Sequence, residues 1–177
     1  MTTLKTPVTP ADHSQGPPDA PLTLLEYGDY ECPHCGRAHG IVKQLQERFG
    51  DDLRFVFRNF PLANIHPHAQ LAAESAEAAG AQGHFWPMHD WLFENQDNLE
   101  PDSIAAGARA SGIDLRRFLA DLQSRTFEKK VRDDFMSGAR SGVNGTPTFF
   151  INGERHNGDY ELETLAAALD AALQRAA

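Results

Sequence analysis

The chain has 177 residues, of which 41% are hydrophobic and 23% are charged. These values are typical of one soluble globular domain, or of one domain that carries an insertion. The formal net charge of −9 argues against a nucleic-acid partner, and no apolar run reaches the roughly 18 residues of a membrane-spanning helix.

Residues 1–21 contain five of the eleven prolines of the chain, which predicts an extended N-terminal arm or linker. Whether this arm docks on the domain is left open. The segment has no apolar stretch of the kind that a secretory signal peptide contains. We therefore expect a cytoplasmic protein, and a periplasmic one only if a leader has been removed.

The next segment predicts a strand, a helix and a second strand. Residues 22–27 are a short apolar run between a proline and a glycine, and residues 53–57 are rich in β-favouring types. Between them, apolar residues recur at helical spacing over 33–49, and Gly50 supplies a stop. A βαβ unit with short links predicts parallel pairing of the two strands.

Residues 62–142 change character. Ala-rich and amphipathic segments follow one another, separated by glycine or proline, and none carries a strand pattern. They predict an all-helical insertion. The residues expected on its inner face are Phe85, Met88, Trp91 and Leu92.

The chain then returns to β structure. Residues 148–151 predict a strand, Asn152-Gly153 a hairpin turn, and residues 154–156 the return strand. Leucines at helical spacing from Leu162 to Leu173 predict a closing helix. The expected fold is α/β, with β-α-β (22–61) and β-β-α (143–177) forming one domain around the helical insertion.

The two cysteines of the chain, Cys32 and Cys35, flank Pro33 and His34 where the first strand leads into the helix. Unpaired N–H groups and the positive end of the helix dipole favour a thiolate there. Pro33 suits the first helical position, where its missing N–H costs nothing. We expect Cys32 to be the exposed nucleophile and Cys35, on the same helical face, the buried resolving thiol.

His34 is expected to set the redox potential rather than to create the site. Its ring N–H or its positive charge could stabilise the Cys32 thiolate, and a more stable thiolate makes the disulfide a stronger oxidant, by about 1.4 kcal/mol for each 30 mV. The alternative is that His34 is a solvated residue of the first turn with no energetic role.

Other uses of a C-x-x-C pair fit less well. Covalent haem attachment requires a histidine where this chain has Gly36. A structural zinc site requires four ligands, so His39, His66 or His68 would have to complete it, and no second pair has the usual spacing. We therefore expect neither a metal nor a cofactor.

Gly145-Thr146-Pro147-Thr148, directly before the last two strands, resembles the cis-proline motif of the thioredoxin superfamily. The resemblance implies that Pro147 faces the cysteines and that the backbone of Thr146 pairs with a bound substrate strand. A cis X-Pro bond turns a backbone edge toward the sulfur and has no N–H to compete. The alternative is an ordinary trans turn proline.

Glu26 lies six residues before Cys32, where members of this superfamily often place a buried acid that helps to deprotonate the resolving thiol. A carboxyl inside an apolar strand has a raised pKa and can move a proton near neutrality. The alternative is an exposed carboxylate at the edge of a strand. Asp29 and Glu31 are expected only to solvate the loop.

After Pro21 nearly the whole chain resembles DsbA-like thioredoxin-fold oxidoreductases, especially the type that some bacteria have free in the cytoplasm or appended to Na⁺/H⁺ antiporters. The Cys-Pro-His-Cys sequence is also that of periplasmic DsbA, and the helical insertion distinguishes this branch from plain thioredoxin. The resemblance rests on the segments ECPHCGRAH, FVFRNFPL, HPHAQLAAESAEAAGAQGHFWPMHD and GTPTFFINGERHNG.

The resemblance implies a thiol–disulfide oxidoreductase in which Cys32 attacks, Cys35 resolves the mixed disulfide, and Glu26 or water moves the protons. Expected partners are disulfide or dithiol proteins or small molecules, with glutathione or a thioredoxin-type protein exchanging electrons. The alternative is a non-catalytic redox-sensing or regulatory module, for example of a membrane transporter. Residues 64–68 are a candidate contact surface. The redox direction, the substrate and the oligomeric state stay open.

Overall fold

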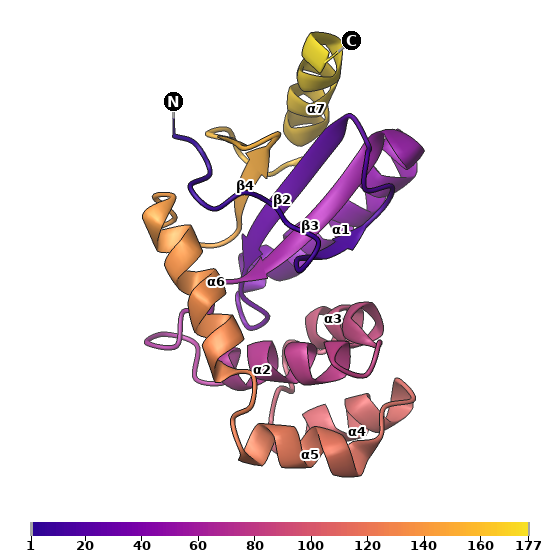
Figure 1. Cartoon of the computed structure of the whole chain (residues 1–177), viewed down its shortest axis with the longest axis vertical. Helices are drawn as coiled ribbons and strands as arrows, with labels where there is room; N and C mark the ends of the chain where they lie inside the picture. Colours follow the sequence, from indigo (N-terminus) through magenta and orange to yellow (C-terminus); the bar gives the residue numbers. More distant parts are fainter. Residues whose placement is uncertain (1, 177) are drawn as a thin grey trace.

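The computed structural model describes residues 2–176, which fold around a five-stranded sheet with the strand order β1-β3-β2-β4-β5 (Figure 1). At its centre β2 (Leu22–Gly28) and β3 (Leu53–Asn59) pair in parallel along their whole length, and α1 (Pro33–Phe49) connects them. A one-turn 3₁₀ helix, Gly50–Asp52, follows α1. The predicted βαβ unit and both bounds of its helix are confirmed.

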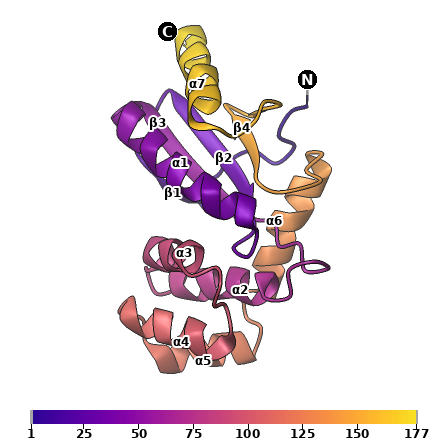
Figure 2. The same ribbon diagram turned by 180° about the vertical axis from the view of Figure 1, so that it is seen from behind.

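The C-terminal half of the sheet is antiparallel. β4 (Thr148–Ile151) pairs with β2, and β5 (Glu154–Arg155) pairs with β4. Asn152 and Gly153 both have positive φ, 49° and 83°, as a tight hairpin turn between right-twisted strands requires. α7 (Leu162–Ala176) then contacts α1, and the two helices lie on the same face of the sheet (Figure 2).

Between β3 and β4 the chain forms a helical layer beyond one end of the sheet, and its last helix returns in contact with β3 (Figures 1 and 2). Within residues 62–142 the structure contains helices and no strand, as predicted. Across the described residues, no helix has the length and apolar character needed to span a bilayer. The helices are α2 (Ala69–Gly80), α3 (Phe85–Glu94), α4 (Pro101–Ala110), α5 (Leu115–Gln123) and α6 (Glu128–Arg140).

The expected inner face of the insertion is largely correct. Phe85, Met88 and Leu92 are buried in the main core cluster, whereas Trp91 is only partly buried and packs against it. Trp91 lies over Gly107 of α4, where an added Cβ would come within 2.4 Å of the indole. Glycine at position 107 therefore allows the close approach of α3 and α4.

The N-terminal arm docks on the domain, which composition had left open. Its β1 (His13–Gln15) pairs antiparallel with the outer edge of β3, a strand that the proline-rich pattern did not predict. Asp12 Oδ1 accepts a hydrogen bond of 2.8 Å from Nε of buried Arg58, and Leu4 and Val8 pack on the sheet face opposite α1. The arm thus covers one edge and part of one face of the sheet.

Candidate active site

Cys32 and Cys35 lie where β2 leads into α1. Cys32 is the N-cap residue of the helix and Pro33 its first residue, as the sequence predicted. The N–H of Cys32 donates to the carbonyl of Asp29 (3.1 Å), and its own carbonyl accepts from the N–H of Gly36 (3.1 Å). These bonds fix the first turn of α1, so the two thiols have defined positions.

Both thiols are free and buried, and Cys32 is only 4% exposed, which corrects the expectation of an exposed nucleophile. Two distant segments contact this residue. The carbonyl of Thr146 lies 3.6 Å from Cys32 Sγ, and the side-chain amide of Gln96 donates to the carbonyls of Tyr30 and Cys32, each at 2.8 Å. Gln96 follows α3, and sequence reasoning did not identify it.

The environments of the two thiols shift their pKa values in opposite directions. The pKa of Cys32 is lowered to about 5, chiefly by a hydrogen bond with the Cys35 thiol, with burial opposing and with Thr146 and the N–H groups of Cys35 and His34 contributing. Burial raises the pKa of Cys35 well above its usual value, and the hydrogen bond to Cys32 acts in the same direction. At neutral pH Cys32 is therefore the thiolate and Cys35 the thiol.

Glu26 is buried in the middle of β2, between Phe57 of β3 and Phe149 of β4, and is 1% exposed. Its Oε1 has no hydrogen-bond partner within residues 2–176. Burial, and next the charge of Cys32, raises the pKa of this carboxyl to about 8. The interpretation as a buried acid is therefore favoured over an exposed edge carboxylate.

The Thr146–Pro147 peptide bond is cis, and this loop lies against Cys32 although the two are more than a hundred residues apart in the chain. The hydroxyl of Thr148 donates to the carbonyl of Gly145 (2.8 Å), which stabilises the loop. A cavity of about 190 Å³ opens beside Pro147. Its lining includes Pro147, Arg155, His156, Asn157 and Tyr160.

The ring of exposed His34 points to Tyr160 and Arg37 rather than to the thiols. Its Nδ1 lies 2.7 Å from Tyr160 Oη and accepts a hydrogen bond of 2.8 Å from Arg37 Nη2. A guanidinium can only donate, so Nδ1 is the acceptor in this bond. His34 therefore acts on Cys32 through its backbone N–H, not through the ring or a charge as expected.

Asp29 and Glu31 are not simply loop-solvating acids, which corrects a second expectation. Asp29 is buried, and its Oδ2 accepts from the N–H of Leu62 and lies 2.8 Å from His66 Nδ1. Glu31 Oε1 lies 2.9 Å from His68 Nδ1. These pairs attach residues 64–68 to the loop before Cys32, and they leave the Nδ1 atoms of His66 and His68 bound to carboxylates.

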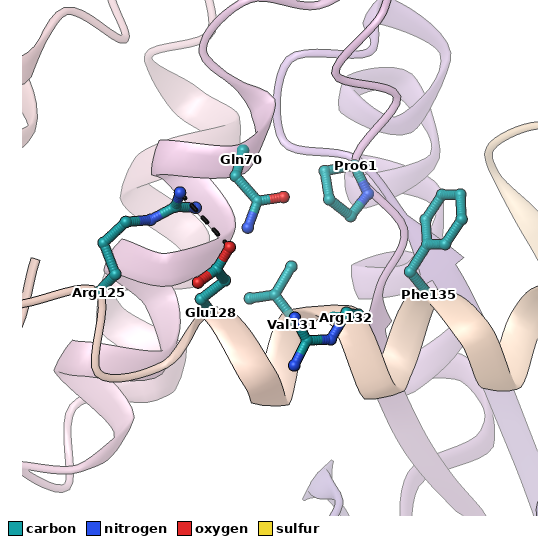
Figure 3. A pocket seen from close by; sticks show the side chains of 7 residues that line it. All are labelled: Pro61, Gln70, Arg125, Glu128, Val131, Arg132 and Phe135. Carbon is teal, nitrogen blue, oxygen red and sulfur yellow. Dashed lines mark ion pairs between the residues drawn. The ribbon is translucent and has the colours of Figure 1, made fainter.

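A second cavity, of about 390 Å³, lies between α6 and the segment that follows β3 (Figure 3). Arg125 and Glu128 pair across its mouth at 3.4 Å. Its lining includes neither cysteine nor the cis-proline loop, so this cavity is separate from the thiol site. The lining residues are Pro61, Gln70, Arg125, Glu128, Val131, Arg132 and Phe135.

A thioredoxin fold with a helical insertion, whose cysteine pair faces a cis-proline loop, defines the DsbA-like class of thiol–disulfide oxidoreductases. Comparison with known proteins agrees with this class. The chain belongs to the thioredoxin family, whose model, described as "Thioredoxin", matches residues 8–171.

Two solved structures are similar over nearly the whole chain. Oxidised BdbD from Bacillus subtilis is 26% identical, with a TM-score of 0.83 over 92% of this chain and 93% of that one. A thioredoxin-like oxidoreductase from Silicibacter pomeroyi is also 26% identical, with a TM-score of 0.83 over 94% of each chain. The second name agrees with an oxidoreductase of the thioredoxin fold.

Curated relatives carry a different name. Na⁺/H⁺ antiporter NhaA 1 of Salinispora arenicola is 46% identical over 170 residues, which are 96% of this chain and 26% of the antiporter. NhaA of Herminiimonas arsenicoxydans is 45% identical over 169 residues, 95% of this chain and 27% of that protein. The chain thus spans about a quarter of the length of these relatives.

Proposed function

We propose that this protein catalyses dithiol–disulfide exchange through Cys32 and Cys35, with proteins or small molecules that carry disulfides or dithiols as substrates. The observation that carries the proposal is the arrangement of the two sulfurs. Cys32 lies at the start of α1 against the carbonyl of Thr146, and Cys35 lies fully buried behind it with its Sγ accepting from the N–H of Asp29 (3.5 Å). A substrate disulfide can therefore meet only Cys32 first.

In the proposed reaction the Cys32 thiolate attacks one sulfur of the substrate disulfide, and the other substrate sulfur leaves as a thiolate that takes a proton from solvent. Cys35 then loses its proton and attacks Cys32 Sγ. The mixed disulfide breaks, the second substrate sulfur leaves as a thiolate that takes a proton from solvent, and the substrate is released as a dithiol. Cys32 and Cys35 are oxidised to a disulfide. Substrate oxidation is the same sequence in reverse.

Glu26 is the proposed acceptor of the Cys35 proton. It is buried near both thiols, since the charge of Cys32 acts on Glu26 and that of Glu26 on Cys35. With its pKa at about 8, the carboxyl exchanges a proton close to neutral pH. Water is the alternative acceptor.

The substrate chain is proposed to run beside Thr146 and Pro147. Thr146 precedes β4, which starts at Thr148, so its backbone lies outside the strand pairing of the sheet. The cavity beside Pro147 could then receive a side chain next to the reacting disulfide, and Arg155 would favour a polar or acidic one.

The stabilised thiolate supports one direction of electron flow, oxidation of the substrate, and the proposed compartment supports the other. A pKa of about 5 at Cys32 favours the dithiol form and makes the disulfide an oxidant. In the cytoplasm, which remains our proposed compartment, a glutathione pool would instead keep the site reduced. Equilibration of the Cys32–Cys35 pair in glutathione buffers measures its reduction potential. A reduction potential far below that of cytosolic glutathione would rule out the hypothesis that the protein oxidises its substrates.

Turnover tests the proposed function. The protein is expected to accelerate reduction of insulin by a small dithiol, and oxidation of a reduced model peptide, in each case with complete loss on Cys32→Ala. His84→Ala, a change before α3 and outside the thiol site, serves as the matched control. Equal rates for Cys32→Ala and wild type would defeat the proposal.

A second candidate is a redox-sensing module whose thiol pair regulates a transporter, and the match to the NhaA relatives favours it. It predicts no turnover with model disulfides and a binding affinity for an antiporter membrane domain that differs between the dithiol and disulfide forms. Ordinary turnover together with equal binding of both forms eliminates it.

A further inference from the structure

Three potential metal ligands meet where α1 contacts α3, one helical turn beyond Cys35 on α1. They are His39 of α1 and the neighbours His89 and Asp90 of α3, and one ligand atom of each lies within 4.8 Å of the others. His39 Nε2 is 3.5 Å from Asp90 Oδ1. Ligand atoms around tetrahedral Zn²⁺, at bond lengths of about 2.0–2.1 Å, lie about 3.4 Å apart. The His39–Asp90 pair already has this spacing, and the pairs with His89, within 4.8 Å, would contract on binding.

The nitrogen of His39 in this cluster is buried and unsatisfied. The His39 side chain is 10% exposed, and its Nε2 has no hydrogen-bond partner among residues 2–176. Buried ring nitrogens ordinarily have a partner, so one without any requires an explanation. Its ring is stacked on Phe93 (5.0 Å between centroids), which holds the nitrogen toward Asp90.

A hydrogen bond orients the ring of His89. Tyr30 Oη lies 2.9 Å from Nδ1 of this buried histidine, and Nε2 is not used in that bond. Histidines that bind metals usually hold their other ring nitrogen in such a bond. Burial also lowers the pKa of both His39 and His89.

Asp90 supplies the negative charge and the access from solvent. Lys43 Nζ binds its Oδ2 at 3.0 Å and so leaves Oδ1 facing His39. The Asp90 side chain is 32% exposed, which gives an ion a path inward. The charge of Lys43 opposes a cation, but this side chain is itself 45% exposed and its charge is screened by water.

We propose that His39, His89 and Asp90 bind one Zn²⁺ ion, with water completing the coordination. Two imidazoles and a carboxylate are ligands that zinc takes in proteins. Binding changes no oxidation state. The ion would join the helix that carries the cysteines to the helical insertion, a role distinct from thiol exchange.

The test uses the full chain with Cys32 and Cys35 oxidised to a disulfide, because free thiols would themselves bind zinc. Titration against a chromogenic chelator is expected to show one Zn²⁺ per chain. His39→Ala and Asp90→Asn are each expected to weaken binding by roughly 100-fold. His84→Ala removes a histidine outside the cluster and should leave the affinity unchanged.

Cobalt provides a second readout. Co²⁺ bound to the disulfide form should show the visible bands of a nitrogen- and oxygen-ligated site without a sulfur charge-transfer band, and Zn²⁺ should raise the melting temperature of wild type but not of Asp90→Asn. Absence of saturable binding, or equal affinity in wild type, His39→Ala and Asp90→Asn, would overturn the proposal.

Discussion

Replacement of the buried acid by its neutral isostere, Glu26→Gln, should make the stability of the protein less dependent on pH. The pKa of Glu26 rises from its ordinary 4.5 to about 8 on folding, chiefly through burial. Between these values the folded chain binds this proton and the unfolded chain does not, so the free energy of unfolding falls as pH rises. Glutamine is uncharged at every pH, so Glu26→Gln should not show this decrease in the free energy of unfolding.

The magnitude follows from the two pKa values. At about 1.4 kcal/mol per pH unit, the change from 4.5 to about 8 corresponds to about 5 kcal/mol in total. Most of this lies between about pH 5 and pH 7, where the stability of Glu26→Gln relative to wild type should increase by about 3 kcal/mol. Above about pH 8 the difference should level off because the wild-type carboxylate is then ionised in both states.

Urea unfolding of the reduced proteins over this pH range measures the difference, and the other titrating groups are common to both proteins and largely cancel. Exposed Glu47 on α1 offers a matched control, and Glu47→Gln should follow wild type at every pH. The reasoning would be refuted if the difference in unfolding free energy between Glu26→Gln and wild type changed by less than about 0.5 kcal/mol between pH 5 and pH 7.

Three further predictions concern the thiols and the arm. The rate of Cys32 alkylation by iodoacetamide should rise with pH, with a midpoint near pH 5. Cys35→Ala should move that midpoint to higher pH, because the hydrogen bond with Cys35 is the largest cause of the lowered Cys32 pKa. An unchanged midpoint in Cys35→Ala would contradict this. His34→Ala keeps the backbone N–H and should leave the midpoint nearly unchanged, whereas His34→Pro, tolerated in the first helical turn, removes the N–H and should raise it. Asp12→Ala removes the carboxylate that pairs with buried Arg58, although the hydrogen bonds of Arg58 to Thr6, Pro7 and Tyr27 can remain. The free energy of unfolding should fall by about 3–5 kcal/mol in urea denaturation, whereas an arm that contributes nothing would give no change.

The sequence pattern predicted an element correctly where neighbouring residues along the chain determine its structure. Apolar spacing and the Pro33 and Gly50 punctuation predicted both bounds of α1, and Asn152-Gly153 predicted the hairpin between β4 and β5. For Glu26 the resemblance implied a buried acid, and the sequence left an exposed edge carboxylate as the alternative. Pairing of its strand on both edges, seen only in the structure, favours the buried acid.

Contacts between distant segments could not be read in this way. β1 is three polar residues in a proline-rich arm, and it becomes a strand only because β3 offers a free edge. Gln96 and Tyr160 have no pattern of their own, yet they reach the first turn of α1 from the insertion and from the segment before α7. Those tertiary contacts bind the backbone carbonyl of Cys32 and hold the His34 ring against Tyr160.

The measurement that tests the central claim most directly is capture of the mixed disulfide. Cys35→Ala, incubated with a disulfide-bonded protein substrate, should accumulate an adduct that mass spectrometry locates at Cys32, because the resolving thiol is absent. Cys32→Ala should form none through Cys35, which is fully buried. Absence of a Cys32 adduct in Cys35→Ala, or an equal yield of adduct in Cys32→Ala, would contradict the account.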